Sequence, residues 1–156
     1  MTDRPRCYVA GPLGFTEAGR HYYEHVYLPA LTAVVEPVDP WALATADEFA
    51  AAAAKGIDAQ RALALDVGRR NAAAIRSCTL LAAYLEGQEP DSGTVAEVGF
   101  ACGVGLTCFG LRSDARQAGE PGVAVNLQVE ALIVDSGGVI VGSLDALVTA
   151  LTRRPK

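Results

Sequence analysis

The sequence predicts an α/β protein with one open sheet of five parallel strands and helices on both of its faces. Short apolar segments alternate along the chain with longer segments in which apolar residues recur at helical spacing. This alternation is typical of parallel sheets whose strands are connected by helices. The segment TLLAAYLEG, residues 79–87, is continuously apolar, as expected for a strand that is covered on both faces. Because the chain shows no repeat and no low-complexity linker, we expect a single domain over residues 1–156.

Five segments have the length and composition of strands. The segment RCYVAG near the N-terminus is apolar and runs into a Gly-Pro turn, and VVEPVD is bounded by Pro37 and Pro40. Such turn residues commonly limit strands. The expected strands cover residues 6–11, 34–39, 79–87, 106–111 and 139–142.

Six segments have the spacing of helices. Thr45 and Glu48 have the spacing of a capping box, which marks a helix start, and Ser143 is placed to cap the last helix. Gly68 weakens the middle of the longest helix by about 1 kcal/mol. The expected helices cover residues 16–34, 45–56, 57–78, 94–105, 126–138 and 143–154, with a polar, glycine-rich loop over residues 112–125.

This order of elements favours a flavodoxin-like (Rossmann-like) sheet with strand order 2-1-3-4-5. In open α/β sheets, ligands bind beyond the carboxyl ends of the strands, where the strand order reverses. Two turns meet at that point, AGPLGF (residues 10–15) after strand 1 and EGQEPDSGTVAE (residues 86–97) after strand 3. We therefore expect these two turns to build the binding site.

Composition and charge restrict the classes of partner. The chain has 156 residues, of which 51% are hydrophobic and 20% charged, and its net charge is -5, which is typical of a globular domain. Apart from the C-terminal residues 153–156, no cluster of Lys and Arg is present, so we expect no nucleic-acid partner. No segment has the length of a signal peptide or a membrane span. We expect a cytoplasmic protein without a membrane partner that binds a small, weakly charged ligand.

The cysteines and histidines predict no metal site. The four cysteines form no CxxC pair and lie in apolar segments, which favours buried, reduced thiols and a cytoplasmic protein. His21 and His25 are one helical turn apart, and such a pair can bind a metal ion. Because no further ligands complete such a site, we expect a solvated helix face at these histidines.

Asp91 and Glu97, in the turn after strand 3, are open to two interpretations. Thr94 and Glu97 match a capping box, and the sequence Pro-Asp-Ser-Gly around Asp91 is a good turn. The alternative is chemistry, because both carboxylates lie at the ligand-binding end and Gly93 lets a ligand approach the backbone. Two carboxylates in one site are typical of glycosyl transfer, in which one attacks the anomeric carbon and the other serves the leaving group.

The turn after strand 1 offers three further candidates. Tyr8 is placed either to bond a neighbouring carboxylate or to serve as an ordinary strand aromatic residue. Gly11 leaves room for a ligand, and Phe15 either stacks on a planar base or belongs to the core. The chain contains no G-x-G-x-x-G segment that opens a helix, no P-loop and no G-x-S-x-G elbow. These absences exclude the common dinucleotide, phosphate and serine-hydrolase motifs.

Four segments together resemble the nucleoside 2-deoxyribosyltransferases: YVAGPLGF, RRNAAAIRSCTLLAAYLEG, EPDSGTVAEVGFACG and VNLQVEALI. The resemblance covers roughly residues 7–150, and Asp-Ser-Gly-Thr-x-x-Glu is its most specific part. It implies that Glu97 is the nucleophile, that Asp91 contacts the base and that Tyr8 orients the nucleophile. It also places Phe15 among the residues that stack on the base, and makes Asn126 a residue donated by a neighbouring subunit to the 5′ end of the sugar.

Asn71 departs from the commonest pattern of the family. Many members carry aspartate at this position and some carry asparagine, so the departure concerns base preference rather than activity. An amide both donates and accepts hydrogen bonds, whereas a carboxylate only accepts them. Without a role in binding, Asn71 is expected to be an exposed helix residue.

The resemblance implies an enzyme that exchanges nucleobases on 2′-deoxynucleosides through a covalent Glu97 intermediate, with retention of configuration, as in nucleotide salvage. Its implied partners are 2′-deoxynucleosides, free nucleobases and further copies of the chain, in a dimer or larger homo-oligomer with shared active sites. No metal or organic cofactor is implied. Two alternatives remain, an N-glycosidase that hydrolyses nucleosides or their 5′-monophosphates and a non-catalytic nucleoside-binding protein. A phosphate would need cations, for which the candidates are Arg20, Arg69, Arg70 and Arg112.

Overall fold

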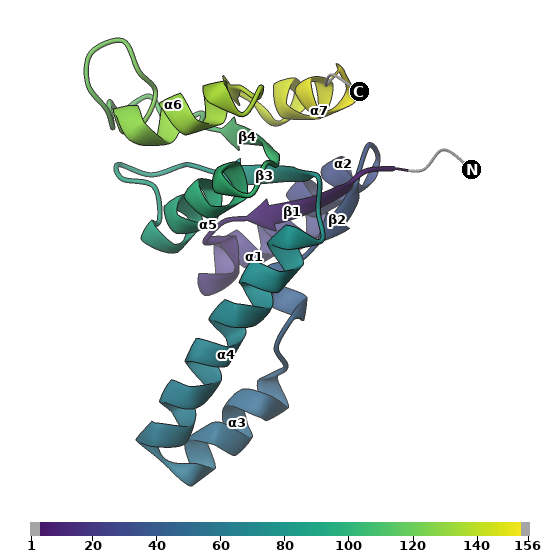
Figure 1. Cartoon of the computed structure of the whole chain (residues 1–156), viewed down its shortest axis with the longest axis vertical. Helices are drawn as coiled ribbons and strands as arrows, with labels where there is room; N and C mark the ends of the chain where they lie inside the picture. The colour runs from purple at the N-terminus through teal and green to yellow at the C-terminus, as the bar shows by residue number, and fades with distance from the viewer. Residues whose placement is uncertain (1–3, 154–156) are drawn as a thin grey trace.

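A computed structural model describes residues 4–153, and Figure 1 shows their arrangement. Five parallel strands form one sheet with the order β2-β1-β3-β4-β5. This confirms the predicted fold class and strand order. The strands are β1 (Arg6–Ala10), β2 (Glu36–Val38), β3 (Leu80–Tyr84), β4 (Thr107–Leu111) and β5 (Ile140–Val141).

The helices follow the predicted segments, with one irregularity near the N-terminus. The predicted helix over residues 16–34 consists of α1 (Glu17–Tyr22), a π-helical turn η2 (Tyr23–Tyr27) and α2 (Leu28–Thr32). Short 3₁₀ turns, η1 (Leu13–Phe15) and η3 (Pro40–Ala42), follow the first two strands. The other helices are α3 (Ala46–Lys55), α4 (Ile57–Arg76), α5 (Ser92–Gly103), α6 (Leu127–Asp135) and α7 (Leu144–Arg153).

The sheet separates two hydrophobic cores, one on each face. Side chains alternate along β1, so that Tyr8 belongs to one core and Val9 to the other, as the two-residue period of a strand requires. Helices α4, α5 and α6 cover the face of Tyr8, with Ile75 and Val98 among the buried residues. The segment from α1 to α2, together with α7, covers the opposite face. This two-sided cover explains why the segment of β3 is continuously apolar.

Helices α3 and α4 form a hairpin that projects away from the sheet (Figure 1). The predicted capping box opens α3, because Thr45 Oγ1 accepts from Glu48 N at 3.2 Å and Glu48 Oε2 accepts from Thr45 N at 2.8 Å. The C-terminal part of α4 returns to the sheet and packs on α5, where Ile75 is buried. The hairpin therefore brings one turn of α4, including Asn71, to the edge of the sheet.

The cysteines and histidines lie as predicted within the described residues. None of the four cysteines forms a disulfide; Cys7, Cys78 and Cys108 are buried and Cys102 is partly buried. His21 and His25 lie on an exposed helix face with their rings stacked at 4.4 Å.

Residues 4–153 contain no cluster of three or more His, Cys, Asp or Glu side chains that could hold a metal ion. None of their helices combines the length and the apolar character that crossing a membrane requires.

The central strand should contribute strongly to stability. Leu81 is fully buried and pairs in register with Tyr8. We expect Leu81→Ala to lower the free energy of unfolding by about 2–5 kcal/mol, because it removes apolar contacts and leaves a cavity. The exposed Leu65 on α4 provides a matched control. Leu65→Ala should change the free energy of unfolding by less than about 0.5 kcal/mol. Urea denaturation of both variants checks this, and equal losses would contradict the assignment of the core.

Candidate active site

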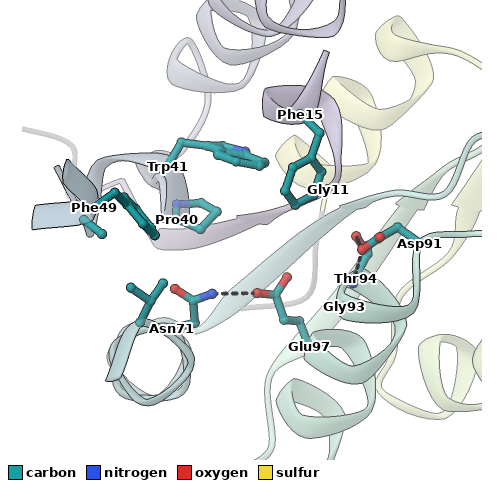
Figure 2. Close-up of a pocket in the computed structure, with 12 residues that line it drawn as sticks. Gly11, Phe15, Pro40, Trp41, Phe49, Asn71, Asp91, Gly93, Thr94 and Glu97 are labelled. Carbon is teal, nitrogen blue, oxygen red and sulfur yellow. Dashed lines mark hydrogen bonds between the residues drawn. The ribbon is translucent and has the colours of Figure 1, made fainter. Parts of the chain in front are cut away.

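A cavity of about 290 Å³ opens at the carboxyl ends of β1 and β3, where the strand order reverses. The position agrees with the general rule for open α/β sheets, and the volume is close to the lower end of small-molecule sites. Figure 2 shows its lining. Six of the predicted site residues border it: Gly11, Phe15, Asn71, Asp91, Gly93 and Glu97.

Glu97 lies in the second turn of α5 and faces the cavity (Figure 2). Tyr8 donates its hydroxyl hydrogen to Glu97 Oε1 at 2.6 Å, and the Asn71 amide Nδ2 donates to the same oxygen at 3.3 Å. Among the described residues, Oε2 accepts no side-chain hydrogen bond. The predicted contact between Tyr8 and a carboxylate is therefore present, although Tyr8 itself is buried behind the cavity wall.

Burial dominates the electrostatics of this group. It raises the pKa of Glu97, the hydrogen bond from Tyr8 opposes this rise, the nearby charge of Asp91 adds to it, and the bond from Asn71 lowers it. Burial and the Glu97 charge hold the pKa of the Tyr8 hydroxyl far above its usual range. Tyr8 therefore stays neutral near neutral pH and acts as a hydrogen-bond donor to Glu97.

Asp91 caps the helix that carries Glu97. Its Oδ2 accepts from Thr94 N at 2.8 Å and from Thr94 Oγ1 at 3.1 Å, which makes Asp91 the N-cap of α5. The predicted capping box between Thr94 and Glu97 is therefore wrong. Thr94 is the third residue of the helix, which begins at Ser92 rather than at Thr94. The carboxylate of Asp91 caps the helix and also borders the cavity.

Aromatic side chains form the opposite wall, facing Asn71, Glu97 and Asp91 across the cavity (Figure 2). Phe15 is 71% exposed and contacts Trp41 edge to face, with ring centroids 4.8 Å apart. Its alternative placement in the core is wrong. Phe49 from α3 extends the same wall. Such a wall suits a planar, aromatic ligand.

Trp41 is held in place by contacts on both sides. Its backbone N–H donates to Asp39 Oδ1 at 2.9 Å, and the same oxygen accepts the Tyr23 hydroxyl at 2.8 Å. The indole lies against Gly14, where an added Cβ would come within 2.3 Å of the ring. A glycine at position 14 is therefore needed for the indole to lie there.

Sequence reasoning missed Trp41 and Phe49. Trp41 follows β2, whose carboxyl end lies beside that of β1, so the rule that selected the first and third turns could also have selected this one. Phe49 stands in an alanine-rich helix, and nothing in its local sequence indicates that α3 folds back over the cavity.

The two predicted glycines border the cavity for reasons of packing. At Gly11 an added Cβ would lie 2.8 Å from Tyr84 Cβ, and at Gly93 it would lie 3.1 Å from Asp91 Oδ2. The distance at Gly11 is too short for any side chain. The close approach of the residue after β1 to Tyr84 at the end of β3 therefore requires glycine at position 11. Small residues thus keep this part of the cavity open.

Asn126 is the one predicted site residue that the structure places apart from this cavity and its wall. It is exposed and caps α6, with its Oδ1 accepting from Gln128 N at 2.9 Å. Asn71, by contrast, is partly buried in the cavity, so the alternative of an exposed helix residue is wrong.

The lining formed by residues 4–153 includes no arginine. Arg112 is buried and donates to the carbonyl oxygens of Leu85, Gly87 and Arg116. Arg70 pairs with Glu48 and Asp66, and Arg20 donates to Gly14 O. None of the four arginines considered for binding a phosphate therefore lines the cavity; these are Arg20, Arg69, Arg70 and Arg112.

Comparison with solved structures shows the same fold in other proteins. A conserved protein from Enterococcus faecalis superposes with a TM-score of 0.72 at 23% identity, over 96% of this chain and 98% of that chain. A 2-desoxiribosyltransferase from Leishmania mexicana gives 0.67 at 22% identity, over 95% and 97%. A CMP N-glycosidase from Clostridium botulinum gives 0.54 at 18% identity, over 94% and 96%.

Comparison of the sequence with family models gives the assignment. A search of the curated proteins found no match. The model of the nucleoside 2-deoxyribosyltransferases, by contrast, matches residues 7–142. That span contains both turns that build the cavity and every residue of its lining. The chain belongs to the nucleoside 2-deoxyribosyltransferase family.

Proposed function

We propose that the protein transfers the 2-deoxyribosyl group of a 2′-deoxynucleoside from one nucleobase to another, with Glu97 as the nucleophile. The observation that carries this proposal is the environment of Glu97. Its carboxylate faces an aromatic-walled cavity, and the buried Tyr8 hydroxyl holds Oε1 at 2.6 Å. A nucleophile needs one oxygen fixed and one oxygen free, and this is the arrangement of the two Glu97 oxygens.

The reaction proceeds in two displacements at C1′. Glu97 Oε2 forms a bond to C1′ while the glycosidic bond breaks, and the electron pair of that bond leaves with the base. Asp91, or a water that it holds, supplies the proton that the leaving base takes up. A ring nitrogen of the second base then attacks C1′, releases the Glu97 carboxylate and passes its own proton back to Asp91 or to the water that Asp91 holds. Two inversions give net retention.

The neighbouring residues support these steps without forming bonds to the sugar. Tyr8 spreads the charge of the carboxylate through a short hydrogen bond. Phe15 and Trp41 offer an edge-to-face pair against which a planar base can stack. The missing 2′-hydroxyl assists, because an electron-withdrawing group at that position destabilises the oxocarbenium-like transition state.

A homo-oligomer with shared active sites is part of this proposal. Asn126 lies outside the cavity of its own chain and is exposed at the start of α6. This position supports a contribution to the sugar site of a neighbouring subunit. The absence of arginine from the lining formed by residues 4–153 favours nucleosides over their 5′-monophosphates.

The transfer reaction can be tested directly by chromatography. Incubation with 2′-deoxyinosine should yield deoxyadenosine only when free adenine is present, and Glu97→Ala should abolish the product. Glu24→Ala, at an exposed position on the opposite face of the sheet, should leave the rate unchanged. Equal release of hypoxanthine without adenine would identify a hydrolase instead. No reaction with purine or pyrimidine deoxynucleosides or their monophosphates would identify a non-catalytic binding protein.

Removal of the Tyr8 hydroxyl should slow the chemistry while leaving binding intact. Hydrogen bonds to charged groups contribute about 1.5–3 kcal/mol, so Tyr8→Phe should lower kcat about 10- to 100-fold. KM should change little, because Tyr8 is fully buried behind Glu97. Steady-state kinetics measure both constants, with Tyr22→Phe on the opposite face of the sheet as control. A rise in KM with unchanged kcat would contradict the role given to Tyr8.

The negative charge of Glu97, which the proposed reaction needs, should lower the stability of the folded protein. Burial raises the pKa of Glu97, so between the unfolded and folded pKa values the native state holds more protons than the unfolded chain. Stability then falls as the pH rises through this range, and the deficit is complete above the folded pKa. Glu97→Gln should therefore raise the Tm at pH 8, and the gain should shrink as the pH is lowered to about 4. Thermal unfolding of both proteins across this range checks the sign, and a lower Tm at pH 8 would contradict it.

A further inference from the structure

Asn71 is, beside Tyr8, the second uncharged side chain that donates a hydrogen bond to the carboxylate of Glu97. It projects from α4 into the cavity beside Glu97 (Figure 2). Its Nδ2 donates to Glu97 Oε1 at 3.3 Å, and its Oδ1 is buried without a hydrogen-bond partner. The amide thus gives a donor to the carboxylate and leaves its own acceptor unused.

The ionised carboxylate fixes the direction of this amide. A carboxylate only accepts hydrogen bonds, whereas a carboxamide has one donor end and one acceptor end. Rotation of the amide would place Oδ1 of Asn71 against Oε1 of Glu97, two acceptors without a hydrogen between them. The observed direction therefore suits an ionised Glu97, and it leaves Oδ1 buried without a hydrogen-bond partner.

The charges around Glu97 show why a neutral donor matters at this position. Asp91, at the start of α5, adds a second negative charge that opposes ionisation. From β1 the facing group is the neutral hydroxyl of Tyr8. On α4, Arg70 pairs with Asp66 and Glu48, and Asn71 is the residue of this helix that donates a hydrogen bond to the carboxylate. An aspartate at position 71 would add a third negative charge within hydrogen-bond distance.

We propose that Asn71 is a positioning residue that keeps Glu97 ionised and holds Oε1 aside, so that Oε2 is the oxygen that attacks. This inference rests on the proposed function for its purpose, but the ionisation of Glu97 can be measured without any reaction. Tyr8 from β1 and Asn71 from α4 then both donate a hydrogen bond to the same oxygen, Glu97 Oε1.

The first test is a titration of the Glu97 carboxyl by carbon-13 NMR in the absence of substrate, with the signal assigned from Glu97→Gln. Asn71→Asp keeps the shape of the side chain and exchanges the donor for a charge. We expect Glu97 to titrate about 1 pH unit or more higher in this variant. Asn71→Leu removes the donor without adding a charge, and Glu97 should titrate higher than in the wild type by a smaller amount.

A charge placed elsewhere on the same helix is the matched control. Gln60 is exposed on α4, eleven residues before Asn71 and therefore about 16 Å away along the helix. Gln60→Glu should leave the titration of Glu97 unchanged. Thermal unfolding verifies that each variant is folded. If Asn71→Asp does not fold, the titration of Glu97 in Asn71→Leu is the test.

The second test is the pH dependence of nucleobase exchange. In Asn71→Asp the acidic limb of kcat/KM should move to higher pH by the same amount as the Glu97 titration, while the rate at pH 9 recovers toward that of the wild type. A Glu97 titration that is unchanged in both Asn71 variants would overturn the inference even if exchange is observed. A shifted titration in a protein without exchange activity would overturn the proposed function and leave the effect of Asn71 on Glu97 confirmed.

Discussion

The hydrogen bond between the Tyr8 hydroxyl and Glu97 Oε1 joins the two halves of the site. It connects the first strand to the helix that follows the third strand, across the point where the strand order reverses. Burial is the main cause that raises the pKa of Glu97, and the hydrogen bond from Tyr8 opposes it, so the bond partly offsets a cost that the fold itself imposes. A buried hydroxyl with no easily lost proton is suited to this task, because it donates without competing for the negative charge.

The remainder of the site can be understood as support for this pair. Asp91 satisfies the first turn of α5 and so fixes the helix that carries Glu97. Trp41 lines the cavity because its backbone N–H donates to Asp39 and Gly14 leaves space for its ring. The carboxylate of Glu97 thus faces polar groups on one side and an aromatic wall on the other (Figure 2). This combination provides room for a planar base beside a reactive oxygen.

The α3–α4 hairpin links the long-range architecture to the chemistry. It projects from the sheet (Figure 1), yet it contributes Phe49 from one helix and Asn71 from the other to the cavity. The cavity therefore depends on an element that the sheet alone does not hold in place.

The sequence by itself determined the fold class, the strand order and the end of the sheet that bears the site, because alternating apolar segments and the reversal rule are local and topological properties. It also determined the pairing of Tyr8 with a carboxylate as one of two options. Only the tertiary structure decided that Asp91, rather than Thr94, caps α5, since several residues near the helix start can satisfy the same amides. Likewise, only the packing of α3 over the cavity brought Phe49 to the site, because contacts between distant segments leave no trace in local spacing.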